Sequence, residues 1–262
     1  MRVIKIGGNE LDKSDFMPNF AQVLRDMDEP TVIVHGGGKA VDELQQRLGQ
    51  ETIKIQGMRR TDSDTLHTAL MVLCGLVGKQ LAAALLTAGV DAVSLCGVDG
   101  GLLRVKKLEI PDGDLGYVGE IISVRADLLM DLLAQGITPV IAPISLGTDG
   151  QIYNVNADQA ASAIAVALQA EHIDFVSNVP GVMVDGEILA CLTRDEAGQL
   201  MASGAINGGM VPKVQAALDV SGKGIPNVRI VDLNGLEQDR GTTFTIPDSR
   251  SASTTPRNEG AP

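Results

Sequence analysis

Thr31–Lys39, with the sequence TVIVHGGGK, is the stretch that decides the fold. An apolar, β-branched run followed by a histidine, three glycines and a helix-forming segment is typical of a buried parallel strand that turns into a helix. The glycines let the backbone approach a ligand closely, and N–H groups of the turn and of the helix start, from about Lys39, can face an anion. A tight or mobile loop without a ligand is the alternative. Other glycine-rich strand ends favour a ligand site.

The rest of the chain repeats this alternation of strand and helix patterns. We expect strands at Arg2–Ile6, Thr31–His35, Ala92–Leu95, Thr138–Ala142, Ile173–Val176, Val228–Val231 and Thr242–Thr245. We expect helices at about 13–27, 39–48, 64–87, 125–135, 156–168, 193–203 and 211–220. This order predicts an α/β fold, a three-layer αβα sandwich with a mainly parallel central sheet. Ligands bind such sheets at the carboxyl ends of the strands, where the glycine turns fall.

Two segments fall outside this alternation. Leu102–Ile122 contains strand-like pieces that the sequence Pro-Asp-Gly at 111–113 interrupts, so we expect hairpins above the sheet. The tail from Pro247 has no apolar periodicity, and we expect it to be disordered.

The composition excludes several classes of function. The 262 residues carry a formal net charge of −12 with four Phe, two Tyr and no Trp, so we expect neither nucleic acid nor an anionic membrane as a partner. No apolar run is long enough to span a bilayer, and no signal-peptide pattern opens the chain. Cys74, Cys96 and Cys191 lack CxxC spacing and are expected to be reduced thiols of a cytoplasmic protein. His35 is expected to orient the glycine turn, because three distant histidines argue against a metal site.

The familiar phosphate-binding signatures are absent. No GxGxxG follows a strand, no GxxxxGK followed by Ser or Thr occurs, and the protein-kinase motifs are missing. A phosphate bound to this chain therefore needs a different arrangement.

Two lysines accompany glycine pairs. Lys5 precedes a Gly-Gly pair at the end of the first strand, where a buried lysine requires a negative partner. A lysine that extends to solvent is the alternative. Lys213 follows another Gly-Gly pair and Pro212 near the start of a helix, where the helix dipole disfavours a cation. This placement fits an anion clamp, although surface lysines are common too.

Two more polar motifs lie at junctions that lead into helices. Arg59 suits bidentate pairing with a carboxylate, although its segment alone is more typical of a helix start capped by Thr61 or the next residue. Asn156 is expected to cap the following helix, which leaves Asn154 and Asp158 available for ligand binding or for organising lysines. A solvated cluster of capping residues is the alternative.

Together these motifs resemble those of the N-acetylglutamate kinases, which have the amino-acid-kinase fold, and they occur in the same order. The resemblance runs from about Val3 to Phe244. It rests on five motifs, Lys5-x-Gly7-Gly8, His35-Gly36-Gly37-Gly38, Gly57-x-Arg59-x-Thr61-Asp62, NVNADQA at 154–160 and Gly208-Gly209-Met210-x-Pro212-Lys213. It implies transfer of the γ-phosphoryl group of ATP to the γ-carboxylate of N-acetyl-L-glutamate, in arginine biosynthesis.

The resemblance also implies roles for individual residues. Catalytic roles fall to Lys5, Lys213, Asp158, Gly8 and Gly37. Substrate binding falls to Gly37, Gly38, Arg59 and Asn154. Nucleotide binding falls to Lys5, Ser177, Asn178, Gly181 and Lys213. Mg²⁺ is expected to be carried by the nucleotide phosphates, with no protein metal site. A carboxylate with a pKa of about 4.3 is already ionised at neutral pH, so the reaction needs no general base.

Further expectations concern lobes and assembly. Residues 1–246 would form one domain, whose N-terminal lobe (about 1–170) binds acetylglutamate and dimerises and whose C-terminal lobe (about 171–246) binds ATP. Members of the family that arginine inhibits have an extra helix before the first strand. Here the first strand begins by Arg2 or Val3, so we expect a homodimer without arginine feedback. Two positions depart from the family: Asn178 stands where Asp is usual beside the nucleotide, and Gly78 where Asn is common.

Two other interpretations stay open. Related kinases of lysine biosynthesis act on a carboxylate displayed by a small acidic carrier protein, and the SNVPG stretch at 177–181 is similar to theirs. Against this, a strongly acidic chain would repel an acidic partner. A non-catalytic ligand-sensing module would be expected to have lost Lys5, Lys213 or Asp158, and all three are present.

Overall fold

One large sheet forms the middle layer of the molecule. The structure, a computed structural model, describes residues 1–27, 29–55, 58–111 and 113–245. The strand order is β13-β15-β14-β10-β1-β2-β8-β6-β7, and β5 and β9 also pair with β8. The strands are β1 (Arg2–Ile6), β2 (Thr31–His35), β5 (Ala92–Gly97), β6 (Leu103–Lys107), β7 (Gly119–Val124), β8 (Thr138–Gly147), β9 (Ile152–Asn154), β10 (His172–Val176), β13 (Cys191–Thr193), β14 (Asn227–Val231) and β15 (Thr242–Thr245).

Most neighbouring strands are parallel, as the sequence predicted. The antiparallel pairs of this sheet are β14–β15, β6–β7 and β8–β9. The β6–β7 pair confirms a hairpin in the segment 102–122, but its position above the sheet was wrong: β6 pairs with β8, so the hairpin extends the large sheet at its edge. Two small hairpins lie outside the sheet: β3 (Lys54–Ile55) with β4 (Met58–Arg59), and β11 (Met183–Val184) with β12 (Glu187–Ile188).

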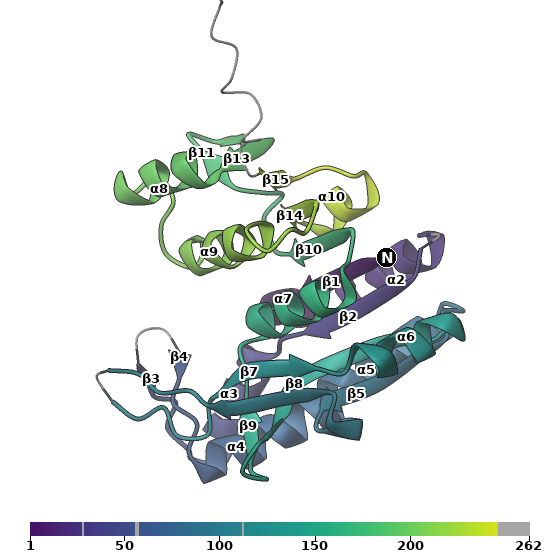
Figure 1. Cartoon of the computed structure of the whole chain (residues 1–262), viewed down its shortest axis with the longest axis vertical. Helices are drawn as coiled ribbons and strands as arrows, with labels where there is room; N and C mark the ends of the chain where they lie inside the picture. The colour runs from purple at the N-terminus through teal and green to yellow at the C-terminus, as the bar shows by residue number, and fades with distance from the viewer. Residues whose placement is uncertain (28, 56–57, 112, 246–262) are drawn as a thin grey trace, which may run out of the picture.

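Helices cover both faces of the sheet (Figure 1). On one face pack α6 (Ala126–Ala134), α7 (Ala157–Leu168), α8 (Arg194–Ala202) and α9 (Met210–Ser221). On the other pack α2 (Phe16–Asp26), α3 (Gly38–Arg47), the long helix 63–87 and α10 (Leu233–Glu237). In β1, Val3 belongs to the first core, whereas Ile4 and Ile6 belong to the second. This alternation confirms the three-layer αβα sandwich.

The long helix contains a wide turn that the sequence pattern did not reveal. It consists of α4 (Ser63–Ala69), a π-helical segment (Leu70–Val77) and α5 (Gly78–Thr87). By length and composition it could cross a bilayer. Its apolar residues Val72, Leu73 and Leu81 are instead buried in the core, against β5 and β8.

The short elements are those that the sequence did not predict. They are α1 (Gly8–Leu11), the β11–β12 hairpin, β13 and α10. Each is too short to show an apolar period. The helix expected from residue 13 begins at Phe16, and the strand expected at 138–142 continues to Gly147. The tail from Pro247, Gly57 and Asp112 lie outside the described residues.

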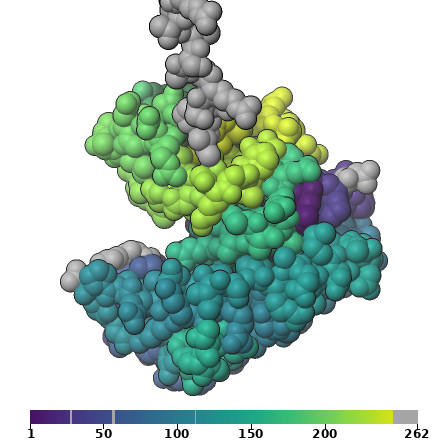
Figure 2. Space-filling model, viewed as in Figure 1, coloured from purple at the N-terminus to yellow at the C-terminus, as the bar shows by residue number. Residues whose placement is uncertain are grey.

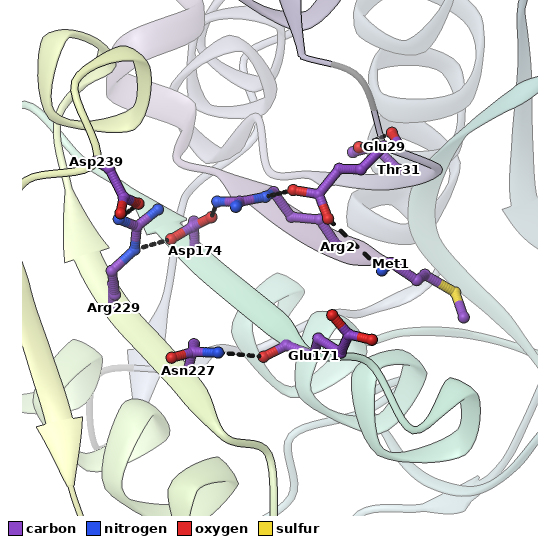
Figure 3. A network of polar contacts seen from close by, with 9 residues as sticks. All are labelled: Met1, Arg2, Glu29, Thr31, Glu171, Asp174, Asn227, Arg229 and Asp239. Carbon is purple, nitrogen blue, oxygen red and sulfur yellow. Dashed lines mark hydrogen bonds and ion pairs between the residues drawn. The ribbon is translucent and has the colours of Figure 1, made fainter.

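A chain of ion pairs connects the three central strands β1, β10 and β14 (Figure 3). Asp174 of β10 is fully buried and accepts from both Arg2 of β1 and Arg229 of β14, the latter at 2.6 Å. Arg229 also pairs with Asp239, and Arg2 pairs with Glu29. Burial opposes the charge of Arg229, but Asp174 outweighs it and the pKa of Arg229 lies above its ordinary value. Arg2 is the first residue of β1, and Asp174 and Arg229 are the middle residues of β10 and β14, so the network lies away from the glycine turns.

Candidate functional site

Two glycine turns meet where β1 and β2 end. Ile6 lies opposite His35 in the sheet, and the Gly36 N–H donates to the Ile6 carbonyl at 2.9 Å. A Cβ added to Gly8 would lie 3.0 Å from the amide nitrogen of Gly38. The turns therefore touch backbone to backbone, which only residues without a side chain allow.

Gly37 is constrained on its other side by the long helix. Its φ is +157°, and a Cβ there would lie 2.7 Å from the Leu73 Cδ2. Leu73 belongs to the π-helical segment, which thus packs directly on the glycine turn. Wide turns of this type are frequent at functional sites.

His35 orients the turn, as the sequence predicted. Its Nδ1 lies 2.9 Å from the Gly36 carbonyl, which can only accept, so Nδ1 carries the proton. The ring is fully buried, and its Nε2 has no hydrogen-bond partner among the described residues. Burial lowers the pKa of His35 to about 4, so the ring is neutral at physiological pH.

Lys5 has the negative partner that its buried position requires. The Lys5 Nζ lies 2.8 Å from Oδ1 of Asp158, and the Lys5 side chain is only 8% exposed. Asp158 is held at the start of α7, where the Asn156 side chain caps the helix by accepting from the N–H groups of Asp158 and Gln159 at 2.7 and 3.3 Å. The helix cap places this carboxylate over β1.

Lys213 reaches the same region from α9. Its Nζ donates to the Ser177 Oγ at 2.6 Å, at the carboxyl end of β10. Burial and the charge of Lys5 lower the pKa of Lys213, while Glu10 and Asp158 act in the opposite direction. Two cationic groups and two carboxylates therefore gather at the ends of β1 and β10.

A cavity of about 240 Å³ opens beside these groups. Seven of the site residues expected from the sequence line it: Lys5, Gly8, Gly37, Gly38, Arg59, Asn154 and Asp158. The apolar part of the lining includes Val41, Leu73 and Pro143. Backbone N–H groups, two cationic side chains and an amide thus line one small cavity, which suits a small anionic ligand.

Hydrogen bonds to α3 and to the glycine turn hold the Arg59 side chain in place. It donates to Asp42, to the Gln45 Oε1 at 2.8 Å and to the Gly38 carbonyl at 3.0 Å. Burial opposes the charge of Asp42, but Arg59 keeps the pKa of that carboxyl below its ordinary value. The helix-start interpretation of this segment is also correct, because Asp62 caps α4. The segment therefore serves two purposes: Arg59 lines the cavity, and Asp62 caps the helix that follows.

The residues expected to bind nucleotide are only partly brought together. Ser177 and Asn178 line a second cavity, of about 520 Å³, on the α2 side of the sheet. Gly181 instead packs against β15, where a Cβ would lie 2.7 Å from the Thr242 Oγ1. A third cavity, of about 490 Å³, lies between α7, α9 and β7 and reaches Asp158. Figure 2 shows the surface hollowed between the segment containing α9 and the segments below it.

Three polar residues of the site were not predicted from the sequence. Asp42 and Gln45 hold Arg59, and Glu10 lies on α1 beside Gly7. Asp42 and Gln45 look like ordinary polar positions of an amphipathic helix, and α1 is too short to be recognised. No local pattern indicates these residues.

The chain is similar to known proteins over most of its length. A model of the amino acid kinase family matches residues 1–232. The acetylglutamate kinase of Roseiflexus sp. (strain RS-1) is 51% identical over 242 residues, covering 92% of each chain. That of Chloroflexus aurantiacus is 46% identical, covering 93% of this chain and 96% of the relative. A solved structure from Streptococcus mutans UA159 is similar with a TM-score of 0.82 and 31% identity, covering 93% of this chain and 98% of that one.

Proposed function

The chain belongs to the amino acid kinase family, and we propose that it transfers the γ-phosphoryl group of ATP to the γ-carboxylate of N-acetyl-L-glutamate, in arginine biosynthesis. Relatives named acetylglutamate kinase at 46 and 51% identity over nearly the whole chain support this activity. The observation that carries the proposal is that Lys5 and Asp158 line one cavity with the glycine turns and Arg59, while the charges of Lys5 and Asp158 act on the pKa of nearby Lys213.

The acceptor binds in the cavity of about 240 Å³. Arg59 and Asn154 bind the α-carboxylate, since guanidinium and amide donors match carboxylate oxygens. The backbone of Gly37 and Gly38 lies along the acyl chain, because no side chain intervenes there. The γ-carboxylate then points toward Gly8 and Lys5.

The reaction is a direct displacement. An oxygen of the γ-carboxylate attacks the γ-phosphorus of ATP, the new O–P bond forms, and the bond from that phosphorus to the β,γ-bridging oxygen breaks as ADP leaves. The carboxylate is already ionised, so no proton has to be removed. The site has to align the reactants and stabilise charge on the phosphoryl oxygens. Lys5 and Lys213 supply that charge, with the N–H groups of Gly8 and Gly37, and Asp158 holds Lys5 in place.

ATP occupies the C-terminal lobe, about 171–246, with its phosphates toward Lys213. The cavity between α7 and α9 gives it an open path to Asp158. Of the segment that follows β10, Ser177 and Asn178 remain to contact the nucleotide, because Ser177 already meets Lys213 whereas Gly181 packs against β15. Mg²⁺ enters as part of the substrate, bound to the nucleotide phosphates.

The N-terminal lobe, about 1–170, also provides a face for a homodimer of a cytoplasmic enzyme. Met71, Leu76 and Leu86 on the long helix are 54, 50 and 53% exposed, on a helix whose opposite side is buried. Large apolar side chains aligned along one helix favour association with a second copy.

Chemical trapping of the product tests this function directly. Transfer to a carboxylate makes an acyl phosphate, which hydroxylamine converts to a stable hydroxamate. We expect hydroxamate to accumulate with MgATP and N-acetyl-L-glutamate. Formation of ADP and free phosphate without any hydroxamate would contradict the proposed transfer.

A further inference from the structure

Gln45 is a fully buried amide in a hydrogen-bond network that reaches Arg59. It lies near the end of α3, and its side chain has no exposed surface. Its Oε1 accepts from the Arg59 Nη1 at 2.8 Å, and its Nε2 donates to the Thr65 Oγ1 at 3.0 Å. A buried amide is costly unless both of its ends find partners, and here both do. Gln45 therefore connects Arg59 to the first turn of α4.

Arg59 is anchored along one face of α3. Gly38, Asp42 and Gln45 follow one another at spacings of four and three residues, so they lie on the same face of the helix. The Arg59 Nη2 donates to the Gly38 carbonyl at 3.0 Å, and its Nη1 donates to Asp42 as well as to Gln45. One helix thus fixes the guanidinium that the β3–β4 hairpin provides.

These hydrogen bonds leave one edge of the guanidinium open. A guanidinium has five N–H groups, one on Nε and two on each Nη. Asp42 and Gln45 use both groups of Nη1, and the Gly38 carbonyl uses one of Nη2. Among the described residues, the Nε–H and the second Nη2–H have no acceptor. Two neighbouring donors of this kind match the two oxygens of a carboxylate, and Arg59 lines the cavity of about 240 Å³.

We propose that Gln45 is a positioning residue for the acceptor: together with Asp42 it occupies the Arg59 Nη1 and so presents the Nε–Nη2 edge to the α-carboxylate. This inference rests on the proposed function, which places that carboxylate on Arg59. It extends the function, because it names the residue that determines which edge binds. Gln45 does not line the cavity, so it acts through Arg59 and not by contact with the acceptor.

Gln45→Met tests the proposal, because it keeps the approximate shape of the side chain and removes both hydrogen bonds. We expect the Kd and the KM for N-acetyl-L-glutamate to rise by about 10- to 100-fold, as for the loss of a hydrogen bond to a charged group. The kcat and the KM for ATP should stay within about threefold, since Lys5 and Lys213 are unchanged. Gln46→Met removes the same amide from the adjacent, exposed position of α3 and is the matched control. It should change none of these quantities.

A double variant separates positioning from a purely structural role. In an Arg59→Met chain, addition of Gln45→Met should weaken acceptor binding little further, because Gln45 acts only through Arg59. Additive losses would overturn the proposal, and so would a lower melting temperature of Gln45→Met with an unchanged KM for the acceptor. A fall in kcat alone would overturn it as well.

If Gln45→Met does not fold, Gln45→Asn provides the same test, because it withdraws the amide by one methylene. The same rise in the Kd for N-acetyl-L-glutamate is expected, and an unchanged Kd would overturn the proposal. A wild-type chain that binds no N-acetyl-L-glutamate would instead contradict the proposed function itself, so the two failures are distinguishable.

Discussion

The ammonium group of Lys5, in β1, lies 2.8 Å from a carboxylate oxygen of Asp158, at the start of α7. The pair joins residues that are distant in sequence because α7 packs on β1. Lys5 shares the α7 side of its strand with Val3, and the Asn156 cap fixes the first turn of the helix. The ion pair therefore follows from strand alternation and a helix cap together.

Asp158→Asn tests the role of this pair. We expect kcat to fall by about 10²-fold, because Lys5 loses the group that positions it for the phosphoryl oxygens. Binding of N-acetyl-L-glutamate should change little, since Arg59 and Asn154 remain. Steady-state kinetics measure both, and Asp131→Asn, at an exposed position of α6, is the control. Normal turnover by Asp158→Asn would contradict the role of Asp158.

Lys213→Ala separates an enzyme from a ligand-sensing module of the same fold. We expect kcat to fall by about 10²–10³-fold, with the melting temperature nearly unchanged, because the lysine acts on charge that develops in the transition state. Lys106→Ala removes the same charge from an exposed strand position and should retain full activity. A Lys213→Ala chain with near-normal turnover would contradict a catalytic Lys213.

The sequence predicted the regular elements and most of the cavity lining, for identifiable reasons. β1 and β2 are short apolar runs that end in glycines, and Lys5, Arg59 and Asn154 lie within or next to recognisable motifs. Glu10 and Asp42 could not be found, because their importance depends on what folds against them. The π-helical turn that brings Leu73 onto Gly37 was also missed, since a wide turn leaves the apolar period of a long helix almost unchanged. Gly181 illustrates the opposite case: its motif is recognisable, but the structure packs it against β15 rather than into a cavity.

His35 should make stability depend on pH in the acid range. Its folded-state pKa is about 4, whereas the unfolded chain has the ordinary value near 6.5. Between these values the unfolded state binds a proton that the folded state does not, so stability is complete above about 6.5 and falls as the pH decreases toward 4. The loss amounts to about 3 kcal/mol, because each pKa unit corresponds to about 1.4 kcal/mol.

Urea unfolding of the wild-type chain and of His35→Asn, measured from pH 7 to pH 4, checks this dependence. Asn keeps a donor near the position of Nδ1 but cannot titrate, so the variant should lose less stability than the wild type over this range. Identical pH profiles for the two chains would contradict a buried, neutral His35.

Leu76→Glu tests the proposed homodimer face. A charge without a partner in an apolar interface should weaken association by about 100-fold or more. Light scattering should then show a monomer at concentrations where the wild type is a dimer. Ile188→Glu, at an exposed position of the β11–β12 hairpin, is the control and should leave the dimer intact. A Leu76→Glu chain that remains dimeric would place the interface elsewhere.

The most direct test of the account measures ADP release by the purified chain with MgATP and three acceptors. We predict turnover with N-acetyl-L-glutamate and none above background with free glutamate or N-acetyl-aspartate, because Arg59 and Asn154 fix the distance from the α-carboxylate to the phosphoryl-transfer site. Silence with all three acceptors would contradict the central claim, and would leave the fold in place while favouring a carboxylate displayed on a carrier protein as the acceptor.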